Sequence, residues 1–328
     1  MASLAASASG QAARTGLGAP VFTLILAVIA VGLFGIGKAI GNSYAFFMGY
    51  VVLQYIVLGT AWNILGGYTG YVNFGVTAFF AIGAYSTVVW HKLVPAMPLP
   101  VMIVIGGAMA GLVGLGTGYL TLRLRGVFFS IATLALAVVV QTLITNWDFV
   151  GGARGAYVLR PRTTSLLGLP YIEYLFILML VMCVIVLVVA RQIERSALGY
   201  GFAAIRDDEA AAEAAGVPTL KLKLIATTLS GGFMGMAGAP LPYYVSYLDP
   251  ASGFSLNYAV NAIAMPLIGG MSSWVGPVIG AVLVGGLQEW IRVTISSALN
   301  VLVAGVLMVG FVILAPQGIV GLFQRKKK

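Results

Sequence analysis

Charged side chains, histidine and cysteine are scarce in this sequence of 328 residues. Asp, Glu, Lys and Arg make up only 8% of it, and there is one histidine and one cysteine. A lone cysteine, Cys183, excludes a disulfide within the chain and a cysteine metal site, and a lone histidine, His91, excludes a histidine metal cluster. The patterns GxxxxGK[ST], HExxH and GxSxG do not occur. We therefore expect this chain to bind no cofactor, and no nucleotide by the P-loop route.

Apolar residues dominate instead. They make up 60% of the chain, and the mean hydropathy is +1.01. Several runs of about 20 residues carry almost no charge, which is the length that a helix needs to cross the hydrocarbon core. These runs are continuous rather than alternating, which excludes a membrane β-barrel. The sequence predicts an all-α polytopic membrane bundle, and its 43 glycines predict close helix packing with some broken helices.

The apolar runs predict about ten membrane-spanning segments. We expect them near residues 21–36, 44–62, 66–90, 101–122, 126–147, 171–190, 224–241, 256–268, 278–297 and 299–314. They form one transmembrane domain, residues 20–320, between a disordered tail at 1–19 and a basic tail at 321–328. The short run 256–268 leaves two possibilities open, because it either crosses the membrane or re-enters it.

The distribution of positive charge predicts the orientation. Ten spans place both termini on one side, and that side then carries twelve of the 18 Lys and Arg residues. Loops rich in Lys and Arg face the cytoplasm, so we expect both termini to be cytoplasmic. Much of the net charge of +9 is explained by this topology, and we expect no nucleic-acid partner.

One charged segment, residues 199–223, interrupts the apolar chain. The residues that favour the start and the end of a helix here are Asp207, Asp208, Glu209 and Gly216. We interpret a short helix within residues 199–218 as cytoplasmic and as lying outside the membrane. Such a helix either only fixes the loop or offers a docking surface to a soluble partner. Because the segment lacks the Leu, Phe and Trp of a membrane-surface helix, docking is favoured.

Two acidic residues of this segment predict a contact with something basic. Glu209 and Glu213 stand four residues apart on one helix face, where like charges repel. A positive group that meets them would remove this cost. We interpret them, together with Arg206, as part of the docking surface.

Polar residues and glycines gather around the third apolar run. The candidates for lining a polar path through the membrane are Asn63, Thr69, Asn73, Gly75, Thr77 and Gly83. Irregular backbone is tolerated inside a membrane where it lines a cavity. Plain packing of small residues between helices would give the same composition, and this alternative stays open.

A further pair, Glu289 and Arg292, lies three residues apart within the predicted span 278–297. The two are close enough to neutralise each other, so we expect an intramembrane charge pair. A proton-coupled carrier usually has more ionisable groups along its path. We therefore interpret the chain as a transport pathway that depends on another protein for its energy.

Four stretches together carry a family resemblance. They are GGYTGYVNFGVTAFFAIGAY, GGARG, AIRDDEAAAEAAGVPTLKLKLIATTLSGGFMGMAGA and MPLIGGMSSWVGPVIGAVLVGGLQEW. In this combination and order the sequence resembles the LivM-type permeases of branched-chain amino-acid ABC transporters, over about residues 40–320. The family's coupling segment corresponds to residues 204–216, with Arg206, Glu209, Glu213 and Gly216 at its recurring positions. The general importer motif EAAxxxG is not matched, because the glycine comes one residue late.

The resemblance implies an importer assembled from several chains in the bacterial cytoplasmic membrane. Its partners would be a LivH-like second permease, two cytoplasmic ABC ATPase subunits that use ATP and Mg, an extracytoplasmic solute-binding protein, and membrane lipid. A branched-chain or other hydrophobic amino acid is the expected solute; urea, short amides and aromatic acids are alternatives within the same family.

Two other classes compete with this interpretation. A stand-alone secondary carrier or channel would suit an inverted repeat, and the segments 66–90 and 256–277 are broken in a similar way. An integral-membrane enzyme is disfavoured because the sequence contains no catalytic constellation. Transport that needs neither ATP nor partner proteins would identify the carrier.

Overall fold

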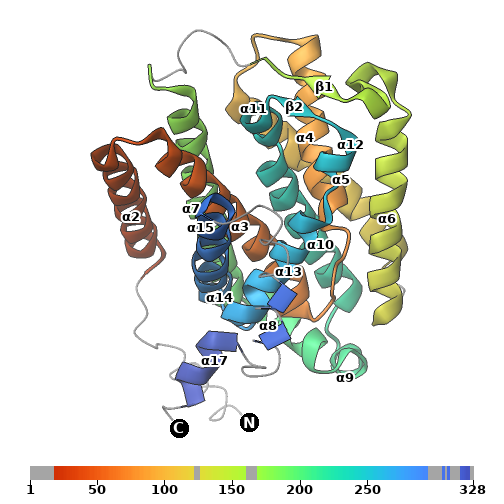
Figure 1. Ribbon diagram of the computed structural model, residues 1–328. Helices are drawn as coiled ribbons and strands as arrows, with labels where there is room; N and C mark the ends of the chain where they lie inside the picture. The colour runs from red at the N-terminus through yellow and green to blue at the C-terminus, as the bar shows by residue number, and fades with distance from the viewer. Residues whose placement is uncertain are drawn as a thin grey trace.

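The computed structural model describes residues 18–121, 126–159, 168–294, 305–306, 309–310 and 318–325. Within these ranges the chain is a bundle of helices with one very small sheet (Figure 1). The expected N-terminal tail, apart from its last two residues, and most of the expected span 299–314 lie outside the described residues. Residues 321–325, expected in the basic tail, belong to the helix α17 (Gly318–Arg325).

Six described helices are long and apolar enough to cross a membrane. They are α2 (Ala19–Ile40), α3 (Ser43–Thr69), α5 (Leu99–Thr121), α6 (Val127–Thr145), α7 (Tyr171–Glu194) and α10 (Thr219–Gly238). Each begins and ends within a few residues of an expected span, except that α3 runs seven residues further. The prediction of an all-α membrane bundle is confirmed; among the described residues six helices meet these criteria, so the expected number of ten spans is not confirmed.

The third expected span is shortened because its first residues extend α3. Residues 66–69 are still helical, an extended stretch follows at 70–75, and α4 (Val76–Leu93) completes the segment. The helix α3 ends at Gly70, whose φ of +77° favours glycine. The expected break therefore occurs, but after Gly66 and Gly67 rather than at them.

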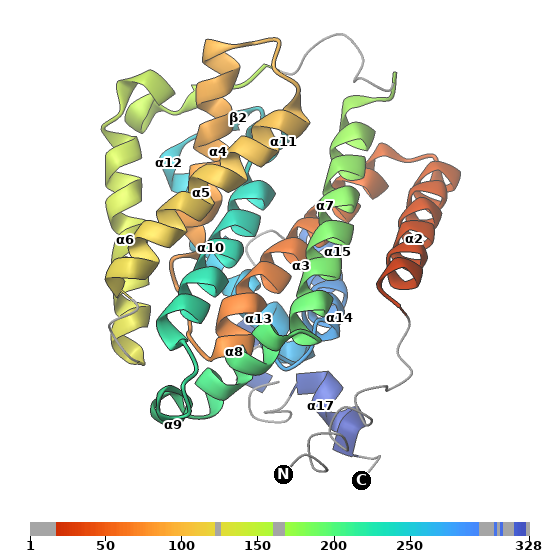
Figure 2. The same cartoon turned by 180° about the vertical axis from the view of Figure 1, so that it is seen from behind.

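Helix α3 lies at the centre of the bundle, and α10 packs against it and against α4 and α5 (Figure 2). Glycine permits this packing at one point. A Cβ atom on Gly83 of α4 would lie 1.8 Å from the carbonyl oxygen of Gly235 on α10, so only glycine lets the two backbones approach. The prediction of close helix packing through glycine is confirmed at this crossing.

The two ends of the bundle carry different short elements. At one end lie α8 (Ala197–Asp207), α9 (Glu209–Ala214) and α17; at the other lie α11 (Leu241–Val245) and the sheet (Figure 1). In the sheet, β1 (Ala156–Tyr157) pairs antiparallel with β2 (Tyr247–Leu248). The short elements η1 (Asp148–Val150), η2 (Gly152–Arg154) and α12 (Pro250–Gly253) complete the loops on either side of these strands.

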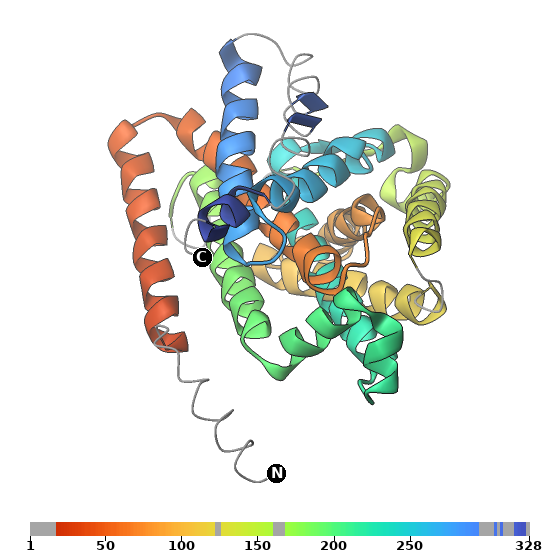
Figure 3. The same ribbon diagram turned by 90° about the horizontal axis from the view of Figure 1, so that it is seen from below.

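The short run 256–268 forms α13 (Leu256–Gly269), which is followed by a turn and a second, continuous helical rod of three elements. This rod consists of α14 (Val275–Gly280), the π-helical turn η3 (Ala281–Gly285) and α15 (Gly286–Thr294). A Cβ on Gly269 would lie 1.7 Å from the Gly276 carbonyl oxygen, so α13 and α14 meet backbone to backbone. Seen from below, α2 and α6 lie on opposite sides of the bundle (Figure 3).

Candidate functional site

The charged segment forms two helices rather than one. Helix α8 ends at Asp207, and Asp208 begins α9 because its side chain accepts the backbone N–H of Ala211 at 3.0 Å. The short helix predicted within residues 199–218 corresponds to α9, which begins at the acidic residues that were expected to favour a helix start. The preference of Asp208 for the N-cap position, where its side chain satisfies a free N–H, explains the break. The expected stop is present, since Gly216 has a φ of +85°.

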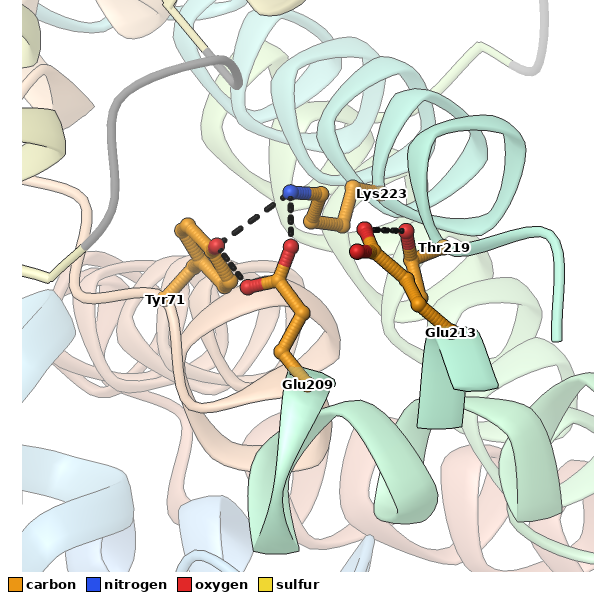
Figure 4. Close-up of polar contacts among 5 residues, drawn as sticks. All are labelled: Tyr71, Glu209, Glu213, Thr219 and Lys223. Carbon is orange, nitrogen blue, oxygen red and sulfur yellow. Dashed lines mark hydrogen bonds and ion pairs between the residues drawn. The ribbon is translucent and has the colours of Figure 1, made fainter. Parts of the chain in front are cut away.

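Glu209, at the start of α9, points into the bundle rather than outward (Figure 4). Its carboxylate lies 2.6 Å from the Lys223 ammonium and accepts a hydrogen bond from the Tyr71 hydroxyl. Lys223 also donates to the Tyr71 oxygen at 3.2 Å. Three segments thereby meet: α9, the first turns of α10, and the extended stretch between α3 and α4. We call Tyr71, Glu209 and Lys223 the coupling triad.

Glu213 has a different partner. Its carboxylate accepts a hydrogen bond from the Thr219 hydroxyl at 2.7 Å (Figure 4). The two like charges of α9 thus each find a donor on α10, which removes the repulsion expected from their spacing. A docking surface that includes Glu209 was expected, but this carboxylate is only 14% exposed and is engaged within the chain.

The charged side chains exposed to solvent on this segment include Arg206, Asp207, Asp208 and Glu213, with the exposed alanines of α9 beside them. Arg206 and Asp207 form an exposed ion pair at 3.4 Å. Small alanines flanked by charged groups leave room for a partner surface to approach closely. Gly216 is exposed as well, and it ends α9 rather than contacting another element.

The stretch 70–75 between α3 and α4 packs against α8. Gly70 lies against Arg206, since a Cβ there would come within 3.1 Å of the arginine Cγ. Helix α6 holds the stretch from the other side: Ser130 donates to the Val72 carbonyl at 2.8 Å, and the Phe74 N–H donates to Thr133 at 3.1 Å. A pocket of about 350 Å³ opens between this stretch, α6, Arg206 and Glu209.

The six expected path residues make separate contacts with neighbouring helices and turns. Asn73 is fully buried; its side chain accepts the Gly75 N–H at 2.7 Å, and its carbonyl accepts the Trp62 indole N–H at 2.8 Å. Asn63 instead faces the turn before α14, where it donates to the Ser273 carbonyl at 3.4 Å. Thr69 donates to a carbonyl of its own helix at 2.6 Å.

The remaining path candidates are also enclosed by protein. Thr77 is buried in the first turn of α4, and Gly83 lies at the crossing of α4 with α10. Gly75 lies against the Thr133 carbonyl oxygen, 2.8 Å from the position of a Cβ. Small-residue packing, the alternative left open by the sequence, accounts for both glycines in this conformation.

Glu289 and Arg292 lie 3.4 Å apart, with the glutamate buried and the arginine half-exposed. Next to them is a pair that the sequence argument missed: the Gln288 amide donates to Asn261 at 3.0 Å. Both amides are buried, and the Gln288 oxygen has no hydrogen-bond partner among the described residues. Polar amides inside apolar runs were the available signal.

Of the coupling triad, only Glu209 was predicted. Lys223 and Tyr71 were not singled out, although Lys223, together with Lys221, stands at the start of an apolar run. In the part of the chain that the structure describes, no group of three His, Cys, Asp or Glu residues is placed to hold a metal ion. The contacts that the structure shows at this site are hydrogen bonds and an ion pair between α9, α10 and the stretch before α4.

Comparison with known proteins gives consistent matches. The family described as "Branched-chain amino acid transport system / permease component" matches residues 44–312. The high-affinity branched-chain amino acid transport system permease protein LivM of Escherichia coli K12 is 28% identical over 293 residues, covering 82% of this chain and 68% of the relative. LivM of Salmonella typhimurium LT2 has the same identity and coverage.

A second kind of relative is similar at a comparable level. The autoinducer 2 import system permease protein LsrC of Enterobacter sp. strain 638 is 26% identical over 267 residues, covering 78% of this chain and 73% of the relative. No solved structure matches the chain significantly.

Proposed function

The chain belongs to the family of permease components of branched-chain amino acid transport systems, and from this membership we propose that it is the membrane subunit of an ATP-driven importer. Its solute in this proposal is a branched-chain or other hydrophobic amino acid. Two cytoplasmic ATPase subunits, a second permease and an extracytoplasmic binding protein complete the transporter. The polar segment made of α8 and α9, residues 197–214, is called the docking segment. The observation that carries the proposal is the direct contact of this segment with the spans through the coupling triad.

The docking segment has an outer and an inner face with separate tasks. Its outer face presents Arg206, Asp207 and Asp208 to a soluble ATPase subunit. On its inner face, Glu209 contacts Lys223 of α10 and Tyr71 of the stretch that precedes α4. A displacement of α9 by the ATPase subunits would therefore pull on two spanning regions at once.

Helix α10 is well placed to pass such a displacement on. It packs against α3, α4 and α5, with the Gly83–Gly235 contact fixing one crossing. Packed helices move as units rather than bending continuously. The switch between outward and inward access would then be a shift of this group of helices, driven by ATP and Mg in the partner subunits.

Orientation follows from the same proposal. The end with α8, α9 and α17 faces the cytoplasm, and the end with β1, β2 and α11 receives the solute-binding protein. Arg191, Arg195, Arg206 and Lys221 lie at the former end, which agrees with the positive-inside rule. Both termini are cytoplasmic in this arrangement.

Reconstitution tests the function and the solute together. The chain is co-expressed with candidate second-permease and ATPase subunits from the same organism, and placed in proteoliposomes with a candidate binding protein. We expect uptake of labelled leucine, isoleucine or valine that needs ATP and Mg. If only urea, acetamide or benzoate inhibited uptake, the solute would be urea, a short amide or an aromatic acid, which are the alternatives within the same family. Transport by this chain alone without ATP would contradict the proposal and favour a secondary carrier.

A further inference from the structure

Helix α2 stands apart from the bundle along most of its length, although it is fastened to α7 near both ends (Figure 2). At one end the Lys38 ammonium lies 2.7 Å from the Glu173 carboxylate. At the other, the Arg191 guanidinium lies 3.8 Å from the centre of the Phe22 ring. The two helices are therefore antiparallel, and the space between these contacts is not filled by side chains.

Two hollows lie end to end in that space. The larger, about 400 Å³, is lined by apolar side chains that include Ala27, Ala30 and Val184. The smaller, about 190 Å³, is lined by Phe22, Val188, Arg191 and Arg195 with Ala19 and Gln192. Only one helical turn separates Val184 from Val188, so the hollows form one groove along α2 and α7. We call it the α2–α7 groove.

The charge at the ends of this groove is unequal. Arg191 and Arg195 both border the end of the groove beside α8. The nearby carboxylate of Glu194 accepts a hydrogen bond from the backbone N–H of Trp274 at 2.9 Å. Phe22 is sandwiched there, since its ring also meets Trp274 at a centroid distance of 4.9 Å. Two guanidinium groups against one carboxylate leave this end positive, whereas the opposite end is neutralised by the Lys38–Glu173 pair.

From these features we propose that the α2–α7 groove binds one anionic phospholipid. Its phosphate meets Arg191 and Arg195, and one acyl chain lies along Ala27, Ala30 and Val184. The apolar lining cannot choose this occupant, because lipid tails are as apolar as the lining itself. Selection comes from the headgroup: the planar guanidinium matches a phosphate, and basic pockets at the cytoplasmic ends of spans favour anionic lipids. The site is independent of the transported solute.

Lipid retention by the full-length chain tests the site. The protein is purified in mild detergent, titrated with equal amounts of phosphatidylglycerol and phosphatidylcholine of the same chain length, and measured by native mass spectrometry. We expect one tightly retained phosphatidylglycerol. The double variant Arg191→Gln, Arg195→Gln should weaken its retention roughly tenfold. The matched control Arg154→Gln removes an exposed arginine at the other end and should change nothing. Equal retention of both lipids would overturn the proposal.

Further variants address the acyl chain and keep the test decisive if the double variant does not fold. Ala27→Trp fills the groove and should abolish retention, whereas Val28→Trp, whose side chain does not line the groove, should not. Arg195→Gln alone changes an exposed residue and should still weaken phosphatidylglycerol retention. An Ala27→Cys variant tests for a protein occupant, because the native Cys183 is buried. Its cross-linking to a partner permease in native membranes would overturn the lipid assignment.

Discussion

The Lys223 ammonium lies 2.6 Å from the Glu209 carboxylate, and the two side chains are only 4% and 14% exposed. Solvent and salt screen such a pair weakly, and removal of one partner leaves the other charge uncompensated. Because Tyr71 contacts both members, the contact joins three segments rather than two. The coupling triad therefore holds the docking segment against the spans, while other residues of that segment face outward.

Neutral substitutions of the pair should show strong energetic coupling. We expect Glu209→Gln and Lys223→Met each to destabilise the chain by about 3 kcal/mol, because each leaves one buried charge. The double variant should lose clearly less than the sum of the two, since neither charge remains. Thermal unfolding of the four proteins in one detergent measures this coupling. Strictly additive losses would show that the two groups do not interact in solution.

Charge reversal separates the inner face of the docking segment from its outer face. Glu209→Lys places a second cation beside Lys223 and should lower both stability and ATP-dependent uptake. Asp207→Lys changes a side chain that is 73% exposed, so its effect on stability should stay within about 0.5 kcal/mol. Its effect should appear in the association rate with the ATPase subunits and in the salt dependence of that rate. Unchanged association would remove Asp207 from the docking surface.

The helices that the sequence predicted best are those whose ends are marked by charge, proline or turn residues. Helix α7 begins directly after Pro170 and ends at Glu194, and α5 begins between Pro98 and Pro100. The end of α3 was predicted less well, because a span was expected to end near residue 62 whereas the helix continues through Gly66 and Gly67. Inside a bundle, glycine stays helical where a neighbour approaches closely. At Gly67 a Cβ would lie 2.6 Å from the Met271 carbonyl oxygen, a contact that sequence alone cannot reveal.

The sequence indicated which segment carries the candidate site, but not the directions in which the side chains of that segment point. The spacing of Glu209 and Glu213 indicated a need for a basic partner, and the structure supplies Lys223 to one and Thr219 to the other. Which way α9 faces depends on the break at Asp208 and on the turn around Gly216. Both features combine a local preference with tertiary packing. The same packing encloses Asn73, which was a candidate for lining a polar path.

Alanine at Gly83 should separate close packing from a role in lining a path. The added Cβ would lie 1.8 Å from the Gly235 carbonyl oxygen, so α4 and α10 must move apart. We expect a loss of about 1 to 3 kcal/mol in the free energy of unfolding. Gly116→Ala is the control, because no atom lies within 4 Å of its added Cβ. Equal stability of the two variants would argue that the crossing adjusts without cost.

The buried amide pair of Asn261 and Gln288 offers the sharpest test of a structural role against a transport role. Gln288→Leu alone leaves the Asn261 oxygen without its donor and should cost about 1 to 3 kcal/mol. Replacing both residues by leucine removes the unpaired group and should restore most of that stability. Gln288 is only 1% exposed, so we expect the restored double variant to retain uptake. Thermal unfolding and uptake in proteoliposomes are measured on the same preparations. A double variant that is stable but unable to transport would instead place these amides on the path of the solute, because only contact with the solute would then distinguish them from leucine.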